Sequence, residues 1–124
     1  MNGINYLLDT NILIGFLQRN PIILDLFQTQ QITISECAYS SITRMELLSF
    51  PSLTMLEKQA IESLLSRMTY LAITPAIENE TIDFRRINQT KLPDSIIAAT
   101  AKHYQLELLT LDKKLVGFMK IKEP

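Results

Sequence analysis

Four acidic residues have the type and spacing to do chemistry together. Asp9 directly follows one short apolar segment and Asp112 comes shortly after another, while Glu46 and Asp94 lie in the first turns of two expected helices. In an open parallel sheet, strand ends and the helix starts that follow them share one edge, where ligands bind. Carboxylates gathered there repel one another, and oxygen ligands without His or Cys favour Mg²⁺ or Mn²⁺ as the offsetting cation.

Each acid also has a purely structural interpretation. Glu46 stands three residues after Thr43, in the spacing of a capping box. Asp94 in a first helical turn gains about 0.3–1 kcal/mol from the helix dipole. Asp9 and Asp112 can be the N-caps of the helices that follow them. Taken together, the four favour a cation site, whose usual work is to activate water and stabilise charge on a phosphoryl group.

The apolar segments before these acids predict buried strands. Residues 4–8 and 106–110 are apolar almost throughout, as strands covered on both faces are. Weaker strand patterns cover residues 31–35 or the alternative 38–41, and a fourth segment at residues 70–74. Such short apolar strands need helices on both faces of the sheet.

Helical patterns lie between the strand candidates. Thr54 and Glu57 form a capping-box pattern that precedes apolar residues at a spacing of four. A looser stripe predicts a helix near residues 76–88, and Pro93 fits the first position of another. Strands alternating with helices imply βαβ units and a parallel sheet, so we expect an α/β architecture in one domain over residues 1–124.

Composition excludes several classes of function. The 124 residues are 47% hydrophobic and 20% charged, with 12 Lys and Arg against 13 Asp and Glu, so nucleic-acid binding must depend on a local patch. Cys37 is the single cysteine and His103 the single histidine, which excludes an intrachain disulfide and a Cys- or His-rich metal site. The apolar stretch at residues 4–17 is too short to span a bilayer, and polar residues interrupt it. We therefore expect a cytoplasmic protein that does not bind or span a membrane.

Three cations near the acids are candidates for binding the phosphate groups of a substrate. Arg44, Lys91 and Lys113 each lie within three residues of one of the four acids. Arg44 fits an ion pair with one of those acids equally well, and lysines of this kind are commonly only solvated. Phosphate contacts supply affinity and no sequence information. We expect His103 to be a surface or packing residue, and Cys37 to be a small buried one.

Four segments, in this order and spacing, resemble the PIN-domain family, and more narrowly the VapC-type toxins of bacterial toxin–antitoxin pairs. The segments are Leu7-Leu-Asp-Thr-Asn-Ile12, Ser41-Ile-Thr-Arg-Met-Glu-Leu47, Leu92-Pro-Asp-Ser-Ile-Ile-Ala-Ala-Thr100 and Leu109-Thr-Leu-Asp112. The first segment is weak by itself, whereas the four together are fairly specific. The resemblance runs over nearly the whole chain.

The resemblance implies a three-layer α/β/α fold with a central, mainly parallel sheet, and a Mg²⁺- or Mn²⁺-dependent endoribonuclease. The family pattern makes four acids the catalytic and metal-binding residues: Asp9, Glu46, Asp94 and Asp112. Asp9 and Asp94 match the most direct metal ligands, and the other two complete the shell or hold metal-bound water. Asn11 and Thr110 match positions that steady the site by hydrogen bonds. The resemblance also implies a homodimer, and a cognate antitoxin protein whose tail covers the acidic pocket.

Other functions remain open at the level of the sequence. One is a non-catalytic RNA- or protein-binding α/β module with an acidic pocket. Another is a phosphatase or phospho-acceptor domain with Asp9 as nucleophile, but a haloacid-dehalogenase pattern wants a second aspartate at the place of Asn11. Dinucleotide binding is disfavoured because no glycine-rich turn follows the first apolar segment.

Overall fold

A parallel sheet lies at the centre of the molecule. The computed structural model describes residues 3–121. Its four strands are β1 (Tyr6–Leu8), β2 (Cys37–Ser40), β3 (Thr69–Leu71) and β4 (Glu107–Leu109). They pair in the order β3-β2-β1-β4, and every pairing is parallel. The predicted parallel sheet is therefore confirmed.

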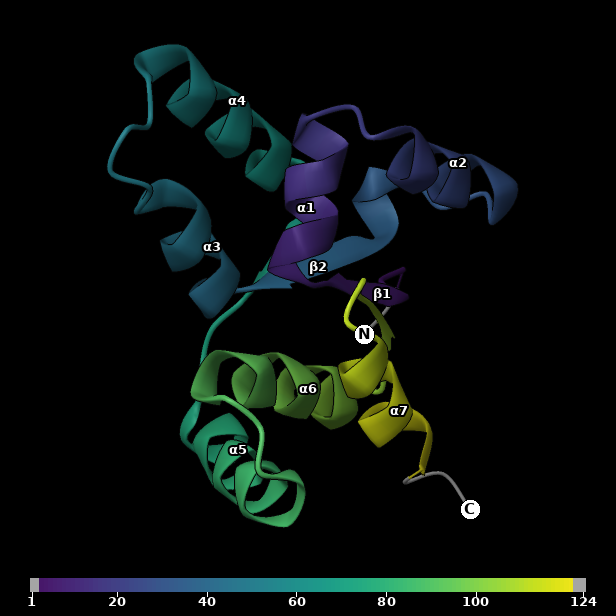
Figure 1. The fold of residues 1–124 in the computed structure, drawn as a ribbon, viewed down its shortest axis with the longest axis vertical. Helices are drawn as coiled ribbons and strands as arrows, with labels where there is room; N and C mark the ends of the chain where they lie inside the picture. The colour runs from purple at the N-terminus through teal and green to yellow at the C-terminus, as the bar shows by residue number, and fades with distance from the viewer. Residues whose placement is uncertain (1–2, 122–124) are drawn as a thin grey trace.

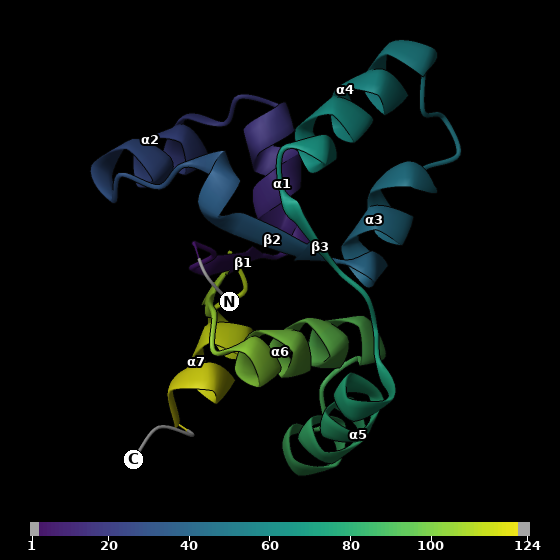
Figure 2. The same ribbon diagram turned by 180° about the vertical axis from the view of Figure 1, so that it is seen from behind.

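Helices cover both faces of this sheet (Figure 1). They are α1 (Thr10–Leu17), α2 (Pro21–Thr29), α3 (Ser41–Leu48), α4 (Met55–Ser66), α5 (Pro75–Asn88), α6 (Leu92–Tyr104) and α7 (Lys113–Ile121). Helices α1 to α4 lie on one side, and α5 to α7 lie on the other, with α5 outside α6; the view from behind in Figure 2 agrees. This is the α/β/α arrangement that the resemblance implies.

The strands send alternate side chains into two separate cores. Leu8 packs with Ile12 and Leu13 of α1 on one face of the sheet. Leu7 packs with Ile97 of α6 on the other face. Leu7 and Leu8 are both fully buried, and burying a leucine side chain stabilises a fold by about 1.5–3 kcal/mol. The double burial explains why β1 is apolar at successive positions.

Helix α6 is the most buried helix of the layer formed by α5, α6 and α7. Every residue from Ser95 to Ala101 is buried, and the alanines in this stretch allow the helix to lie close to its neighbours. The helix begins at Leu92, so Pro93 is its second residue and not the predicted first one. That shift is tolerated because the first turn of a helix has no partners for its N–H groups in any case.

The strand predictions were accurate for β1 and β4 and ambiguous for β2. The alternative at residues 38–41 matches β2, and the alternative at residues 31–35 is wrong. A 3₁₀ turn, η1 (Ile34–Glu36), follows Thr33 there, and the Glu36 carboxylate accepts a hydrogen bond from the Thr33 N–H at 2.9 Å. Local capping of this kind competes with strand pairing.

Two helix starts were predicted from capping patterns, with opposite outcomes. The capping box at the start of α4 is confirmed, with reciprocal hydrogen bonds between Thr54 and Glu57 of 3.1 and 2.9 Å. The placement of Glu46 in a first turn is wrong, because Ser40 caps α3 and its Oγ accepts from the Ile42 N–H. Glu46 is consequently the sixth residue of α3, well inside the helix.

No helix among residues 3–121 combines the length and the apolar character needed to cross a membrane.

Candidate active site

The four acids converge on the edge where β1 and β4 end. Asp9 follows β1 directly, and its N–H donates to the Leu109 carbonyl of β4 at 2.9 Å. The Asp9 side chain caps α1 through Oδ1, which accepts from the Thr10 N–H at 2.7 Å. Only 5% of Asp9 is exposed, so its second oxygen also needs a partner inside the protein.

Thr110 supplies that partner. Its hydroxyl donates to Asp9 Oδ2 at 2.6 Å and accepts from the Asp112 N–H at 3.0 Å, so it links two of the acids. Asn11 ties the same loop to α1, because its Oδ1 accepts from the Leu111 N–H at 3.2 Å. Both predicted supporting residues thus make hydrogen bonds that hold the loop after β4 against the start of α1.

Glu46 reaches the site through Thr10. The Thr10 hydroxyl donates to Glu46 Oε1 at 2.7 Å and lies 3.0 Å from the buried Thr43 Oγ1. Because α3 starts at the end of β2, Glu46 faces α1 across the edge of the sheet. It lies in the second turn of α3, one turn further along the helix than predicted. Thr10 has a positioning role that sequence reasoning missed, because a threonine after an N-cap looks like an ordinary helix residue.

The other two acids are held differently. Asp112 caps α7, and its Oδ1 accepts from the N–H groups of Lys114 and Leu115 at 3.0 and 3.2 Å. Asp94 lies in the first turn of α6, and its half-buried carboxylate accepts no hydrogen bond from any residue of the described chain. Asp94 is therefore the acid of the four whose oxygens are most available to a ligand.

Electrostatics show that the four acids form one cluster. Burial is the main cause that raises the pKa of Asp9, the charges of Glu46 and Asp112 add to it, and the hydrogen bonds from Thr110 and Thr10 oppose it. Burial also raises the pKa of Asp94, and the charges of Asp9 and Asp112 raise it further, while Lys91 lowers it. Like charges this close are stabilised when a cation lies among them.

The donor set suits a hard cation. Every candidate ligand is a carboxylate, and oxygen ligands are those that Mg²⁺ and Mn²⁺ prefer. Within residues 3–121, no three Asp, Glu, His or Cys side chains form a ready-made group that could enclose a metal ion. Mg²⁺ does not need such a group, because it commonly keeps several waters and uses one or two carboxylates with substrate phosphates. Asp9 and Asp94 fit that mode of binding.

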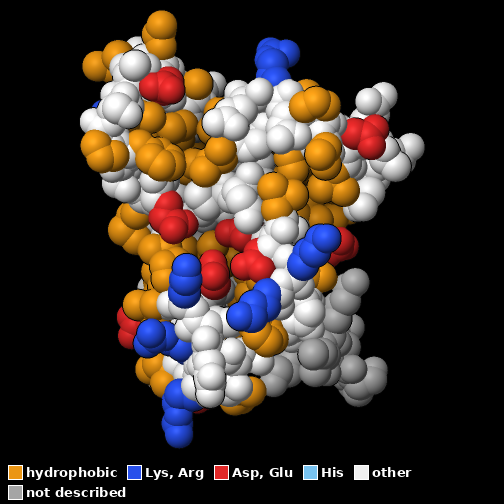
Figure 3. Space-filling model, viewed as in Figure 1, with side chains coloured by type: hydrophobic (Ala, Val, Ile, Leu, Met, Phe, Trp, Pro, Cys, Tyr) orange, Lys and Arg blue, Asp and Glu red, His pale blue; other side chains and the backbone are white. Residues whose placement is uncertain are grey.

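Lys and Arg side chains lie beside and below the acidic cluster on one face of the molecule, as Figure 3 shows. The predicted cations Arg44, Lys91 and Lys113 are all exposed. The alternative that Arg44 pairs with one of the acids does not hold, because Arg44 forms no ion pair with any of the described residues. Arg44 is thus not held by the acidic cluster.

The remaining reactive side chains lie away from this edge. Cys37 is fully buried at the start of β2, and burial is the main cause that raises the pKa of its thiol to about 12, which excludes a thiolate nucleophile. His103 pairs with Glu80 near the end of α6 and packs edge-on against Tyr104. Both observations agree with the non-catalytic roles expected from the sequence.

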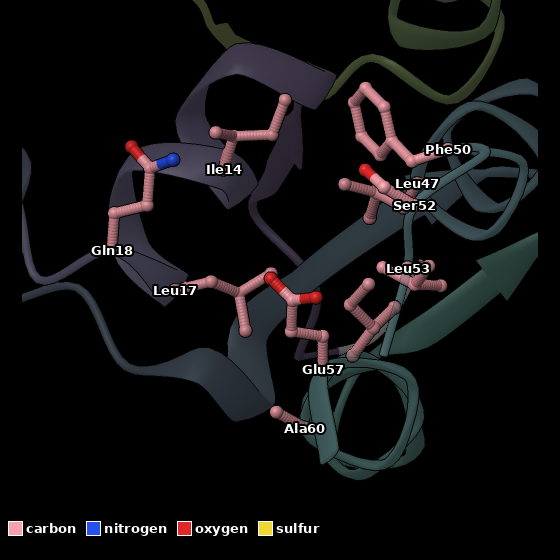
Figure 4. A pocket seen from close by; sticks show the side chains of 10 residues that line it. Ile14, Leu17, Gln18, Leu47, Phe50, Ser52, Leu53, Glu57 and Ala60 are labelled. Atoms are coloured by element: carbon pink, nitrogen blue, oxygen red, sulfur yellow. The ribbon is translucent and has the colours of Figure 1, made fainter. Parts of the chain in front are cut away.

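An apolar groove of about 320 Å³ opens between α1, α3 and α4 (Figure 4). Ile14 and Leu17 come from α1, and Leu47, Phe50 and Leu53 come from α3 and the segment after it. Half of the Phe50 surface is exposed. The groove shares α1 and α3 with the acidic cluster, since those helices carry Thr10 and Glu46.

A parallel sheet between two helical layers, with acids at the edge where its strands end, is the arrangement of a PIN domain. The family model of the PIN domain matches residues 6–121, and the chain belongs to this family. The resemblance inferred from the four sequence segments is thereby confirmed. A search of curated protein sequences found no match.

Chains of solved structures are also similar to this one over nearly its whole length. A chain of a toxin–antitoxin complex from Klebsiella pneumoniae is similar to this one at 31% identity and a TM-score of 0.78, with 91% of this chain and 92% of that chain covered. A chain of DNA-bound VapBC from Salmonella typhimurium matches at 22% identity and a TM-score of 0.75 (92% and 91% covered). FitAcB from Neisseria gonorrhoeae matches at 20% and 0.73 (93% of each). The last two show the fold alone.

Proposed function

We propose that residues 1–124 form a single PIN domain that acts as a Mg²⁺- or Mn²⁺-dependent endoribonuclease, the toxin of a type II toxin–antitoxin pair. PIN domains are generally nucleases that use divalent metal ions. The observation that carries the proposal is the buried carboxylate of Asp9, whose pKa is raised and whose neighbours Glu46 and Asp112 are acids too. A divalent cation held among these carboxylates would offset their mutual repulsion.

The residues have separate roles in this proposal. Asp9 and Asp94 bind the cation directly. Glu46 and Asp112 complete its ligand shell or hold the water bound to it. When bound, a divalent cation lowers the pKa of water and stabilises charge on a phosphoryl group. Asp94 or Glu46 accepts the proton of the attacking water, since a general base must lie within hydrogen-bond reach of it.

Supporting residues keep the acids in place. The Thr110 hydroxyl fixes Asp9 Oδ2, and Asn11 holds the backbone at Leu111. RNA is held by its phosphates, for which Arg44, Lys91 and Lys113 are the candidates because their side chains are exposed beside the acids. Such contacts give binding without sequence preference.

An antitoxin protein is the partner we propose, because the chain is similar to a chain of a toxin–antitoxin complex at 31% identity. The apolar groove between α1, α3 and α4 suits an apolar segment of this partner, which then reaches the acids along α1. We also propose a homodimer in the cytoplasm. Leu56, with 78% of its surface exposed on α4, is the position whose change to Glu tests the dimer by light scattering.

The test is cleavage of total cellular RNA by the purified, partner-free protein. We expect discrete fragments with Mg²⁺ or Mn²⁺, and none with chelator or in Asp94→Asn. Asp25→Asn is the matched control, because Asp25 is an exposed aspartate of α2 outside the acidic cluster. Cleavage by Asp94→Asn at the rate of the control contradicts the site.

Absence of cleavage by the metal-bound protein favours a non-catalytic RNA- or protein-binding module instead. Copurification with RNA, measured by absorbance and sequencing, then identifies what the module binds. Copies that still carry an antitoxin-sized protein must first be stripped of it by denaturation and refolding.

A further inference from the structure

A second hollow, distinct from the apolar groove, adjoins the acidic cluster. It has a volume of about 340 Å³, and Asp94 and Asp112 are among the residues that line it. One wall is the segment of residues 88–91 between α5 and α6, and the other wall comes from α7. A volume of this size lies at the lower end of the range for small-ligand pockets.

The wall between α5 and α6 is held rigidly by hydrogen bonds. Gln89 has a positive φ of 55° and its N–H donates to the Arg85 carbonyl at 2.8 Å, which ends α5. Arg85 Nε donates to the Thr90 carbonyl at 3.2 Å. The Ser95 hydroxyl donates to the Lys91 carbonyl at 2.8 Å and lies 2.6 Å from Thr90 Oγ1. The backbone that carries the Gln89 and Lys91 side chains is therefore fixed before any ligand binds.

The wall on α7 is apolar below and charged at the rim. Leu115 is buried at its base, and Phe118 packs edge-on against Phe84 with ring centroids 6.3 Å apart. Lys114 is exposed on this wall, in the first turn of α7 that Asp112 caps. Its neighbour Lys113, which was the residue predicted from the sequence, does not line the pocket.

The side chains around the pocket match the parts of a nucleotide. The apolar base of the pocket offers a surface to a nucleobase, and Lys91 and Lys114 stand on opposite walls to meet a phosphate. Asn88 Nδ2 donates to the Phe84 carbonyl at 3.1 Å, which leaves its Oδ1 to accept from a base edge, and Gln89 offers a second amide. Amide side chains of this kind read base edges, and lysines bind phosphate.

We propose that this pocket binds the nucleotide of the RNA strand next to the phosphate that is cut. Lys91 and Lys114 contact its phosphate, and Gln89 reads its base. The inference rests on the proposed ribonuclease function, and it names the place where sequence preference arises. It follows because the pocket opens onto Asp94 and Asp112, so a nucleotide held there brings its own phosphate to the acids.

The first test is a titration of the ¹⁵N-labelled full chain with AMP, GMP, CMP and UMP in the presence of Mg²⁺. We expect the backbone signals of Thr90, Lys91 and Lys114 to shift, with one base preferred over the others. The shifts should disappear in the double variant Lys91→Gln/Lys114→Gln. Lys58→Gln, an exposed lysine of α4 far from the pocket in the sequence and on the opposite helical layer, should titrate like the unchanged protein. Shifts that spare the pocket or survive in the double variant overturn the site.

The second test follows RNA cleavage and separates the two proposals. Gln89→Ala should change the relative cleavage of sites that differ in one base by about tenfold. Lys91→Gln and Lys114→Gln should slow all sites alike. In an Asp9→Asn background, each should also lower the salt slope of oligonucleotide binding by roughly 0.7.

The two tests together distinguish failure of the proposed pocket from failure of the proposed ribonuclease function. Unchanged rates and base preference in all three variants overturn the pocket and leave the ribonuclease standing. Shifts with free nucleotides but unchanged RNA cleavage make the pocket a site for free nucleotides and overturn the RNA assignment. A wild-type protein that cuts no RNA but shows the nucleotide shifts contradicts the proposed function, while the nucleotide site remains supported.

Discussion

The Thr110 hydroxyl joins two of the four acids, and we expect it to be a positioning group. It donates to the buried Asp9 Oδ2 and accepts from the Asp112 N–H. Thr110→Val keeps the shape but leaves a buried carboxylate oxygen without a donor. We expect RNA cleavage to fall by about 10–100-fold, as for the partners of metal ligands. We expect the free energy of unfolding, measured with urea, to fall by about 1–3 kcal/mol.

A matched variant and a second measurement separate positioning from packing. Thr110→Ser keeps the hydroxyl and removes the methyl group, so it should cleave RNA nearly as the unchanged protein does. The Mg²⁺ concentration for half-maximal cleavage should rise in the valine variant and stay the same in the serine variant. Cleavage by Thr110→Val at the wild-type rate and Mg²⁺ requirement would show that the hydroxyl only fills space.

The four acids could be predicted from the sequence by their residue type and position. Most of their hydrogen-bond partners could be identified only in the structure. Asp9 and Asp112 are found because each comes shortly after an apolar strand, and the ends of parallel strands meet at one edge of the sheet. Thr10 was missed, since its contact with Glu46 spans 36 positions along the chain and no local pattern encodes it. Of the adjacent Lys113 and Lys114, only Lys114 lines the pocket, because the phase of α7 decides which of the two faces it.

At the scale of elements, Gly15 controls how closely α1 and α2 pack. A Cβ at this position would lie 2.6 Å from Cγ1 of the buried Ile23. Gly15→Ala gains about 0.5–1 kcal/mol of helix stability, but overpacking costs about 1–3 kcal/mol. Because the clash is the larger effect, we expect a net loss of about 1 kcal/mol, measured by urea unfolding.

A double-mutant cycle checks this assignment. Ile23→Ala removes Cγ1 and by itself should cost about 2–5 kcal/mol. In that background Gly15→Ala should be neutral or stabilising, since the clash is gone and the helix gain remains. Equal losses from Gly15→Ala in both backgrounds would show that the cost has another source.

The capping box of α4 should make the stability of this helix depend on pH. The hydrogen bond from the Thr54 backbone N–H is the main cause that lowers the pKa of Glu57 below its ordinary 4.5. A lowered pKa means that the folded state favours the charged form. The stabilisation is therefore fully present above the unfolded pKa and is lost as the pH falls through the folded one.

Glu57→Gln measures that contribution. We expect the wild-type protein to unfold at a higher urea concentration than Glu57→Gln at neutral pH, and the difference to shrink below about pH 4. Glu62→Gln is the control, because Glu62 is an exposed glutamate in the middle of the same helix. A difference between wild type and Glu57→Gln that stays constant with pH contradicts the capping role.

Elements with complete local signals were predicted well, and those defined by tertiary contacts were not. The α4 capping box is local, and both of its hydrogen bonds are present. The start of α3 was misplaced, because the spacing from Thr43 to Glu46 also satisfies a capping-box pattern while Ser40 holds the actual cap. Thr43 is instead buried against α1, a contact that the sequence cannot show.

At the scale of the whole molecule, four segments far apart in the chain bring like charges to one edge of the sheet. Asp9 and Thr110 are 101 positions apart, and their hydrogen bond closes the edge between β1 and β4. The fold therefore keeps a carboxylate whose pKa is raised mainly by burial and further by the charges of other acids. Without a cation, the repulsion among these charges works against folding.

Divalent cations should consequently stabilise the whole fold. We expect Mg²⁺ or Mn²⁺ to raise the Tm of the chelator-treated protein, because a ligand that binds only the folded state adds about 2.7 kcal/mol at 100 times its Kd. Asp94→Asn removes one of the repelling charges and one ligand together. In chelator it should melt at a higher temperature than the wild type, and it should gain little from the cation.

The sign of these two shifts distinguishes a cation site from a set of helix caps. If the acids only cap helices, Asp94→Asn loses a favourable charge near a helix start and melts lower than the wild type in chelator. If they form a cation site, the same change relieves repulsion from Asp9 and Asp112 and melts higher. Asp25→Asn should show the full cation-dependent rise, because Asp25 lies on α2 outside the cluster. An equal rise in Asp94→Asn and Asp25→Asn would place the bound cation elsewhere on the molecule.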